Sequence, residues 1–393
     1  MEIDHWIFFA ITHKVEELDL HFPKCTVVLP ATAFRSETLR ILKLHGLISF
    51  QINGSDIDLP NLKILHLNSI LLLSHFIISK FLSGSPVLEE LLISTHCSHM
   101  SSYFYLQSSS LKRLILEICC NIVVDTPNLQ FLELHDQIWK EIKFKKLCSL
   151  VKAIVDVSQC YDNTIKELGE YGDKVFRLFR QLSNVKTLSL SANTMEALFC
   201  PSSEDLPLFH NLNYLEVTVS GNGWIMLPHI LECSPNLKFV TINKDDEDPG
   251  SEIVPHEVIV WSENVPNCLF SSLEILEFKR FEGSTVEMEV IEYFLKYGQD
   301  DEDLESEIVL DDAIFGQQPL PQCFFSSLEN LEIRGFQGSV MEMEVAGCFL
   351  KNAKVLKEIR ITSSAASFEE ESKFLKKLIM FPRASSMCQV IFS

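Results

Sequence analysis

The chain has 393 residues, of which 47% are hydrophobic, and it carries 33 Lys and Arg against 54 Asp and Glu, a formal net charge of −21. The hydrophobic content excludes an intrinsically disordered chain. The acidic balance argues against nucleic acid or a membrane surface as the main partner, because binding phosphate groups requires clustered Lys and Arg.

The first elements of the chain lead into a repeat. Residues Trp6–Ile11 predict a short capping helix, and Val15–Leu20 predicts the first strand. From there the pattern L-x-x-L-x-L recurs, with conservative replacements, along the whole chain. Its last two apolar positions are two residues apart and therefore point to the same side of a strand. The segments that follow it are Leu39-Leu42-Leu44, Leu62-Leu65-Leu67, Leu88-Leu91-Ile93, Leu111-Leu114-Leu116, Leu129-Leu132-Leu134, Val185-Leu188-Leu190, Leu212-Leu215-Val217, Leu237-Val240-Ile242, Leu273-Leu276-Phe278, Leu328-Leu331-Ile333 and Leu356-Ile359-Ile361.

The spacing of these segments predicts the fold class. The first five begin at residues 39, 62, 88, 111 and 129, which gives steps of 18 to 26 residues. Such steps are typical of leucine-rich repeats, in which each repeat supplies one short strand and a returning helix or irregular segment. One repeat cannot bury its apolar side alone, but stacked repeats can. The sequence therefore predicts an α/β leucine-rich-repeat solenoid, with a curved parallel sheet on the concave face and helices and irregular segments on the convex face.

Several helices are expected between and after the repeats. Apolar residues three and four apart predict a helix over 163–182, following a less regular strand within 150–157. Residues 221–233 and 368–380 also predict helices. The apolar run 67–82 is too short for a membrane span and predicts a packed helix.

The C-terminal third contains a tandem duplication. Residues 245–296 and 300–351 align at an offset of 55, with about 28 of 52 positions identical. Each copy begins with an acidic run, which we expect to be a solvated loop. Only the second copy continues into a further strand and a closing helix. We therefore expect helix 286–296 of the first copy to pack differently from helix 340–350 of the second.

Four C-terminal motifs carry a resemblance to a known family. They are Pro321-x-Cys323-x-x-Ser326-Ser327-Leu328, Gly335-Phe336-x-Gly338-x-x-x-Glu342-x-Glu344, Phe349-Leu350-Lys351-Asn352-Ala353-x-Val355-Leu356 and Phe381-Pro382-Arg383-Ala384-Ser385-Ser386-x-Cys388-Gln389-Val390. These motifs resemble the FBD domain of plant F-box/LRR-repeat proteins, and the start of the chain is similar to the point where the repeats begin in that family. The resemblance implies an F-box that binds the Skp-type adaptor of a cullin ubiquitin ligase, and repeats that select the protein to be ubiquitinated.

Two functions are compatible with this resemblance. Nothing before Trp6 resembles an F-box, so we expect this chain to contain the recognition half of such a protein without the docking half. The first function is a non-enzymatic protein-recognition module, which selects substrates for the ligase when an F-box is present. The alternative is a stand-alone interaction protein that competes with full-length relatives.

The sequence predicts three parts of the chain: a solenoid over 1–244, a partial FBD-like copy over 245–299 and a complete FBD-like domain over 300–393.

Metal, cofactor and catalytic sites have little support in the sequence. His96-Cys97-Ser98-His99 contains zinc-ligand residue types, but a closed zinc site needs a second pair and none follows. Cys119-Cys120 is better explained by core packing, and the twelve scattered Cys and twelve His define no nucleophile with a base beside it. No phosphate-binding glycine motif is present. We therefore expect no cofactor, no metal and no enzymatic activity.

The cysteines and the first residues indicate a compartment. Met1–Phe9 contains Glu2 and Asp4 and lacks the basic start and long apolar stretch of a secretory signal. The scattered cysteines, many beside apolar residues, favour reduced and buried thiols over a disulfide framework. We expect a cytoplasmic or nuclear location, or both.

The remaining candidate site is the sheet surface opposite the helices, called here the open face. If Leu65 and Leu67 point into the core, Ile64, His66 and Asn68 point to the open face. Stacked repeats place such residues in adjacent rows, which form a polar surface suited to a protein partner. The predicted partner-binding residues are Lys43, His45, His66, Asn68, Ser94, Glu117, Glu133, His135, Ser189, Ser191, Glu216, Thr218, Thr241 and Asn243.

Overall fold

The structure is a computed structural model of the chain. It describes residues 2–50, 57–70, 74–95, 104–118, 120–137, 141–145, 147–158, 165–200, 202–203, 205–245, 266–280, 287, 289–290, 327–363 and 368–392. The chain divides into two compact units, the first comprising Met1–Leu188 and Cys200–Pro207 and the second Ser189–Phe199 and Leu208–Ser393.

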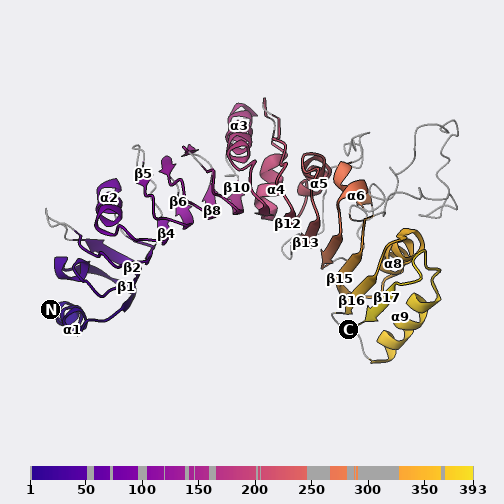
Figure 1. Cartoon of the computed structure of the whole chain (residues 1–393), viewed down its shortest axis with the longest axis horizontal. Helices are drawn as coiled ribbons and strands as arrows, with labels where there is room; N and C mark the ends of the chain where they lie inside the picture. The colour runs from indigo at the N-terminus through magenta and orange to yellow at the C-terminus, as the bar shows by residue number, and fades with distance from the viewer. Residues whose placement is uncertain are drawn as a thin grey trace. The chain divides into compact units, whose positions relative to one another are not determined.

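The first unit is built on a parallel sheet. Among its described residues, the strands of this sheet lie in the order β1-β2-β3-β4-β6-β8-β10. Helices α2 and α3 lie on one side of it (Figure 1). The elements are α1 (Glu2–Thr12), β1 (Glu17–Leu29), the 3-10 helix η1 (Ala31–Phe34), β2 (Ile41–Phe50), β3 (Ile64–Asn68), α2 (His75–Gly84), β4 (Glu90–Thr95), β5 (Phe104–Gln107), β6 (Arg113–Ile118), β7 (Ile122–Asp125), β8 (Phe131–Gln137), β9 (Ile142–Phe144), β10 (Lys152–Ser158) and α3 (Ile165–Gln181).

The second unit repeats this arrangement. Its described strands β12 to β17 pair in sequence order, each parallel to the next. Strand β11 (Thr187–Leu190) contains the point where the chain passes from one unit to the other. The elements that follow are α4 (Ala192–Leu198), β12 (Tyr214–Val219), α5 (Gly223–Glu232), β13 (Phe239–Lys244), α6 (Asn267–Ser271), β14 (Ile275–Lys279), β15 (Asn330–Phe336), α8 (Val340–Asn352), β16 (Glu358–Ser363), α9 (Phe368–Met380) and β17 (Gln389–Phe392).

Each of the eleven repeat segments forms a strand, and the apolar pattern sets how the strands align. Leu42 pairs in register with Leu65, which in turn pairs with Leu91. Leu65 and Leu67 are fully buried, whereas Ile64, His66 and Asn68 between and beside them are half-buried. Burying one leucine contributes about 1.5–3 kcal/mol, so a slip by one residue would lose this contribution along the whole strand. The predicted α/β solenoid is therefore confirmed.

An asparagine side chain links several neighbouring repeats. In three Pro-Asn-Leu segments the Asn Nδ2 donates to a backbone carbonyl of the preceding repeat: Asn61 to Glu37 at 2.7 Å, Asn128 to Ser109 at 2.7 Å, and Asn236 to His210 at 2.8 Å. In each case the acceptor lies two residues before the first apolar residue of its own repeat. The asparagine therefore joins consecutive turns of the solenoid at the point where each strand begins.

The helix predictions agree with the structure at most positions. The predicted helices 163–182, 221–233 and 368–380 correspond to α3, α5 and α9, and the helix expected within 67–82 begins later, at His75. The structure also contains a second sheet that the sequence did not predict. In it β5, β7 and β9 pair in parallel, in the place where a helix or an irregular segment was expected.

Some predictions concern residues outside the described ranges. These are the motif at 96–99, Cys119, the two acidic runs apart from Asp245, and most of the helix at 286–296. The predicted boundaries after residues 244 and 299 lie beside or among such residues, so the three-part division stays a prediction.

Candidate protein-binding face

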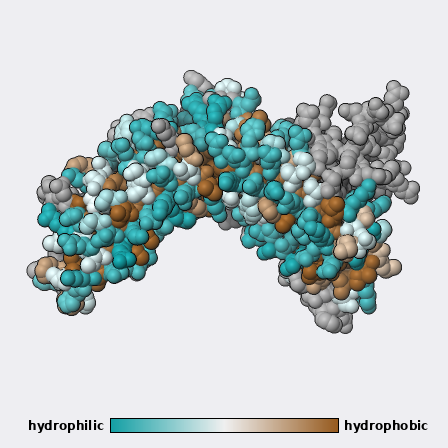
Figure 2. Space-filling view, in the orientation of Figure 1, coloured by the Kyte–Doolittle hydropathy of each residue, from teal (hydrophilic) through white to brown (hydrophobic). Residues whose placement is uncertain are grey.

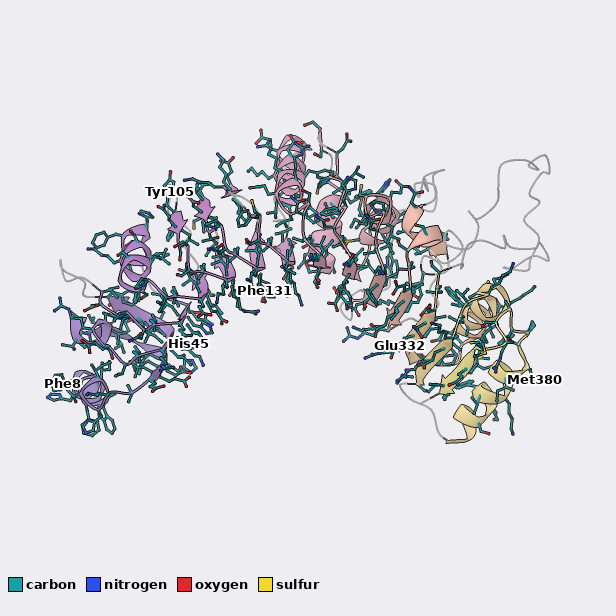
Figure 3. All side chains as sticks on the ribbon, viewed as in Figure 1. Phe8, His45, Tyr105, Phe131, Glu332 and Met380 are labelled. Carbon is teal, nitrogen blue, oxygen red and sulfur yellow. The ribbon has the colours of Figure 1, made fainter. Side chains whose placement is uncertain are left out.

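The open face carries most of the residues predicted to bind a partner. In the first unit, Figure 3 shows His45 and Phe131 on the strand side and Tyr105 on the opposite side. Hydrophilic side chains dominate the visible surface of each unit, and hydrophobic ones are scattered among them (Figure 2). Eleven of the predicted residues are half-buried or exposed on the strands: Lys43, His45, His66, Asn68, Glu117, Glu133, His135, Ser189, Glu216, Thr218 and Asn243.

Two of the predicted residues are buried, and a third lies at a helix start instead of on a strand. Ser94 and Thr241 are only 4% and 3% exposed. Thr241 Oγ1 lies between larger neighbours, 3.0 Å from Glu277 Oε2 and 3.2 Å from the hydroxyl of Tyr214. Ser191 is the N-cap of α4, and its Oγ accepts a hydrogen bond from the backbone N–H of Thr194. The expectation that Ser94 and Thr241 are exposed is therefore wrong, and Ser191 caps a helix instead of lying on a strand.

In the first unit, Arg113 is the centre of a charged and aromatic cluster. Its guanidinium lies 3.6 Å from the ring centroid of Phe131 on the neighbouring strand. It also lies 3.6 Å from a carboxylate oxygen of Glu90 on one side and 3.6 Å from one of Glu133 on the other. Glu90 in turn contacts His66 at 2.7 Å. The cluster thus extends laterally across β3, β4, β6 and β8, because residues in register on parallel strands are neighbours.

The pKa of His135 on the open face is shifted well above the ordinary value for histidine. Its Nδ1 lies 3.3 Å from Asp156 Oδ2 on β10, and its Nε2 lies 3.0 Å from Glu133 Oε1. The hydrogen bond to Asp156 raises the pKa of His135 to about 9, with a smaller contribution from Glu133. The imidazole is therefore a cation at neutral pH, although it stands in an acidic chain.

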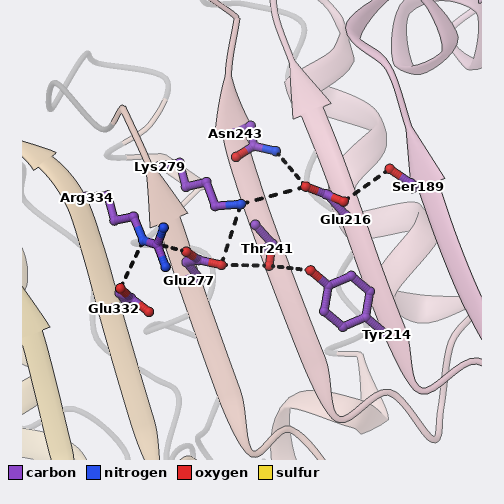
Figure 4. A network of polar contacts seen from close by, with 9 residues as sticks. All are labelled: Ser189, Tyr214, Glu216, Thr241, Asn243, Glu277, Lys279, Glu332 and Arg334. Atoms are coloured by element: carbon purple, nitrogen blue, oxygen red, sulfur yellow. Dashed lines mark hydrogen bonds and ion pairs between the residues drawn. The ribbon is translucent and has the colours of Figure 1, made fainter. Parts of the chain in front are cut away.

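The second unit carries a continuous polar network on its open face (Figure 4). Glu216 accepts hydrogen bonds from Ser189 and Asn243, both at 3.3 Å. Lys279 Nζ lies 3.7 Å from Glu216 and 3.8 Å from Glu277, and so joins the two carboxylates. Arg334 Nε lies 2.9 Å from Glu277, which extends the network to β15. Each of these side chains contacts a neighbour on another strand, so the network links β11 to β15.

Several members of these clusters were not predicted from the sequence. They are Glu90, Arg113, Phe131, Asp156, Tyr214, Glu277, Lys279, Glu332 and Arg334. The sequence could have indicated these residues. Each lies an even number of residues from a predicted open-face residue on its own strand, or at the corresponding position of another repeat. Aromatic residues and Arg are enriched in the cores of protein interfaces, so Phe131 and Arg113 at such positions are a signal for a binding surface.

Among the described residues, no group of three His, Cys, Asp or Glu side chains could hold a metal ion. Burial raises the pKa of the Cys268 thiol to about 12 and that of Cys348 to about 11, so both stay protonated at neutral pH. Within the described part of the chain, no helix is both long enough and apolar enough to cross a membrane.

Family models match two regions of the chain. Residues 3–155 match the model described as "FBD-associated F-box protein At5g56370, LRR repeats". Residues 262–299 and 317–361 match the FBD model. Each segment begins in one copy of the duplication, and the second continues beyond it to residue 361, which agrees with the resemblance seen in the C-terminal motifs.

Relatives from Arabidopsis thaliana match the chain over most of its length. F-box/FBD/LRR-repeat protein At1g78750 is 28% identical over 99% of this chain and 74% of its own length. F-box/FBD/LRR-repeat protein At5g22660 is 27% identical over 98% of this chain and 76% of its own length. Putative F-box protein At3g44060 is 30% identical over 75% of this chain and 69% of its own length.

Proposed function

Because the chain belongs to the plant F-box/FBD/LRR-repeat family, we propose that it is a non-enzymatic recognition module whose open face binds a protein partner. The observation that carries this proposal is the lateral linkage of charged and aromatic side chains across successive strands. Side chains that already contact one another lose less entropy when a partner docks. The cluster contains Arg113, of a residue type that often dominates binding energy in protein interfaces, beside the aromatic Phe131, of a type enriched there.

The bound partner would be a substrate of a ubiquitin ligase when the recognition module is joined to an F-box. The support for this role is the naming of the relatives as F-box proteins. An F-box would recruit the Skp-type adaptor and the cullin, while the solenoid holds the substrate. The acidic chain favours a partner surface that carries basic residues. A cytoplasmic or nuclear location is part of the same proposal.

The test uses the full chain as bait in plant-cell extract, with chemical cross-linking and mass spectrometry. An open-face variant carries Arg113→Ser and His135→Ser. A matched variant carries Tyr105→Ser and Lys145→Ser, which change exposed side chains at the second sheet of the same unit. We expect the wild type and the matched variant to retain the same proteins, and the open-face variant to lose them.

The outcomes separate the possible functions. Recovery of the Skp-type adaptor and cullin together with a retained protein would support the ligase role. Recovery of a retained protein without the adaptor and the cullin is compatible with either function, because in the first function an F-box supplies the contact with the adaptor. Loss of binding in the matched variant, with full binding in the open-face variant, would overturn the proposal that the open face is the binding surface.

A further inference from the structure

The open face of the first unit is not uniformly polar. In each of its strands one residue lies between the two buried apolar residues of the repeat and is called here the middle residue. On β3, β4, β6 and β8 the middle residues form one row, because His66, Leu92, Ile115 and Glu133 are in register. Leu92 and Ile115 are half-buried. Two adjacent strands therefore present aliphatic side chains to the open face at the same level.

The six strands from β11 to β16 carry polar residues at the same position. Their middle residues are Ser189, Glu216, Thr241, Glu277, Glu332 and Arg360. If the fold required an aliphatic side chain there, the requirement would apply to these strands too, since every repeat buries the same positions. The aliphatic pair on β4 and β6 is therefore a local feature of the first unit.

Two further apolar side chains extend the pair to the strands on either side. Ile64 on β3 lies diagonally across from Leu92, and Phe131 on β8 lies diagonally across from Ile115. Both are half-buried, and diagonal neighbours on one face of a sheet are within reach of long side chains. Ile64, Leu92, Ile115 and Phe131 are called here the apolar stripe. It crosses four successive strands, and Figure 3 shows Phe131 at one end of it.

Three cationic side chains border the apolar stripe, and each already has a partner in the chain. Arg113 contacts carboxylates on both neighbouring strands, Glu90 and Glu133. His135 contacts Glu133 and a carboxylate on β10. Lys152 Nζ lies 5.9 Å from the centroid of the aromatic ring at the β8 end of the stripe. The border therefore presents no cation whose charge is left without a neighbouring carboxylate or ring.

Glu117 is an acidic residue at this border in a different situation. It is exposed and lies two residues after Ile115, on the same face of β6. It makes no hydrogen bond or ion pair with another residue that the structure describes. Its neighbours in register are Ser94 and His135, and the imidazole contacts other carboxylates instead. The stripe thus has a carboxylate beside it that is available to a partner.

We propose that the apolar stripe is the centre of the partner interface, and that the partner segment places an aliphatic or aromatic side chain on Leu92 and Ile115 and a lysine or arginine on Glu117. This inference rests on the proposed function and adds the chemistry of the partner. An apolar centre with a polar border is the common anatomy of protein interfaces. The net charge of −21 adds a long-range attraction for a basic segment.

The experiment begins with random dodecapeptides displayed on phage, which are selected on the immobilised full chain. A parallel selection uses Glu117→Lys, and a control selection uses Glu37→Lys. Glu37 is an exposed residue between η1 and β2, so its replacement changes the net charge equally without touching the open face. We expect the wild type and Glu37→Lys to enrich peptides that combine a large apolar residue with Lys or Arg. Glu117→Lys should lose the preference for Lys or Arg.

Fluorescence anisotropy then measures the affinity of an enriched peptide for each variant. We expect Ile115→Gln and Glu117→Lys each to weaken binding about tenfold. Ile275→Gln makes the same apolar-to-polar change at a half-buried residue on β14 of the second unit, and should change the affinity less than about twofold. Equal affinity of the wild type, Ile115→Gln and Glu117→Lys would overturn the inference, as would a wild-type selection that enriches no peptide.

The same variants in plant-cell extract separate this inference from the proposed function. If Ile115→Gln and Glu117→Lys retain the proteins that the variant with Arg113→Ser and His135→Ser loses, the open face is the binding surface but the apolar stripe is not its centre. If the variant with Arg113→Ser and His135→Ser retains them too, the proposed function itself fails.

Discussion

Glu277 and Glu332 lie directly opposite each other on β14 and β15, in register, although both are carboxylates. They hold equal positions in the two copies of the duplication, so stacking the copies places like charges side by side. Arg334 Nε lies 2.9 Å from an oxygen of each. The first copy has Lys279 at the corresponding position. The guanidinium of Arg334 thus offsets the repulsion that the duplication creates.

Replacing Arg334 should expose this repulsion. We expect Arg334→Gln to destabilise the pairing of β14 with β15 by about 1 kcal/mol, because opposed like charges are unfavourable in a sheet. Hydrogen exchange of the backbone amides in these strands should become faster, and added salt should reduce the effect. The matched variant is Arg40→Gln in the first unit, whose Nε lies 3.5 Å from Glu16. Equal effects of both substitutions would contradict this account.

The titration of His135 provides a second prediction. Its folded pKa of about 9 exceeds the ordinary value of 6.5, so protonation favours the folded state. The stabilisation is complete below about pH 6.5 and is lost as the pH rises through about 9. It should stay below about 1 kcal/mol, because the side chain is 39% exposed.

Asp156→Asn should lower the pKa of His135, since the hydrogen bond from Asp156 is the largest cause of the shift. Proton NMR titration of the imidazole measures this change. Asp19→Asn, which removes the carboxylate 3.8 Å from His45, should leave the titration of His135 unaltered. A pKa of His135 near 6.5 in the wild-type protein would refute the observed geometry of this pair.

The asparagine links between repeats predict both a loss and a gain of stability. Asn128→Asp keeps the shape of the side chain but removes the donor to the Ser109 carbonyl, and should lower the free energy of unfolding by about 1 kcal/mol or more.

At Pro86-Val87-Leu88 the asparagine is replaced by Val87, which is 41% exposed. Val87→Asn should form the corresponding bond to the carbonyl of Pro60 and raise the free energy of unfolding by up to about 1 kcal/mol. Val87→Asp is the control, because a carboxylate cannot donate; an equal gain from it would refute the link. Urea unfolding measures all three.

The backbone around Gly46 on β2 leaves no room for a side chain. Its φ is +104°, and a Cβ atom there would overlap the carbonyl group of Phe22 on β1. Gly46→Ala should therefore cost about 2–4 kcal/mol of unfolding free energy. Gly169 on α3 has no neighbouring atom within 4 Å of such a Cβ, so Gly169→Ala should stabilise the protein by up to about 1 kcal/mol. Thermal unfolding of the two variants should shift in opposite directions; a shift in the same direction would contradict the difference in local space.

Local sequence patterns predicted those features that depend on one strand or one helix at a time. The alternation in Leu62–Asn68 predicted which residues enter the core, because side chains along a strand alternate in direction. The apolar spacing in 368–380 predicted the bounds of α9 for a similar reason. The second sheet was missed because β5, β7 and β9 have only three or four residues each, too few for a periodic pattern to distinguish strand from irregular chain.

The sequence by itself thus determined the repeat, the solenoid class, the family resemblance and the residues that face away from the core. Only the tertiary structure decided which of those residues are available. Thr241 is covered by Tyr214 and Glu277, while Arg113 lies between Glu90 and Glu133. These neighbours come from strands 20 or more residues apart, and the register between strands brings them together. A contact between repeats depends on that register, whereas the direction of a side chain along its own strand does not.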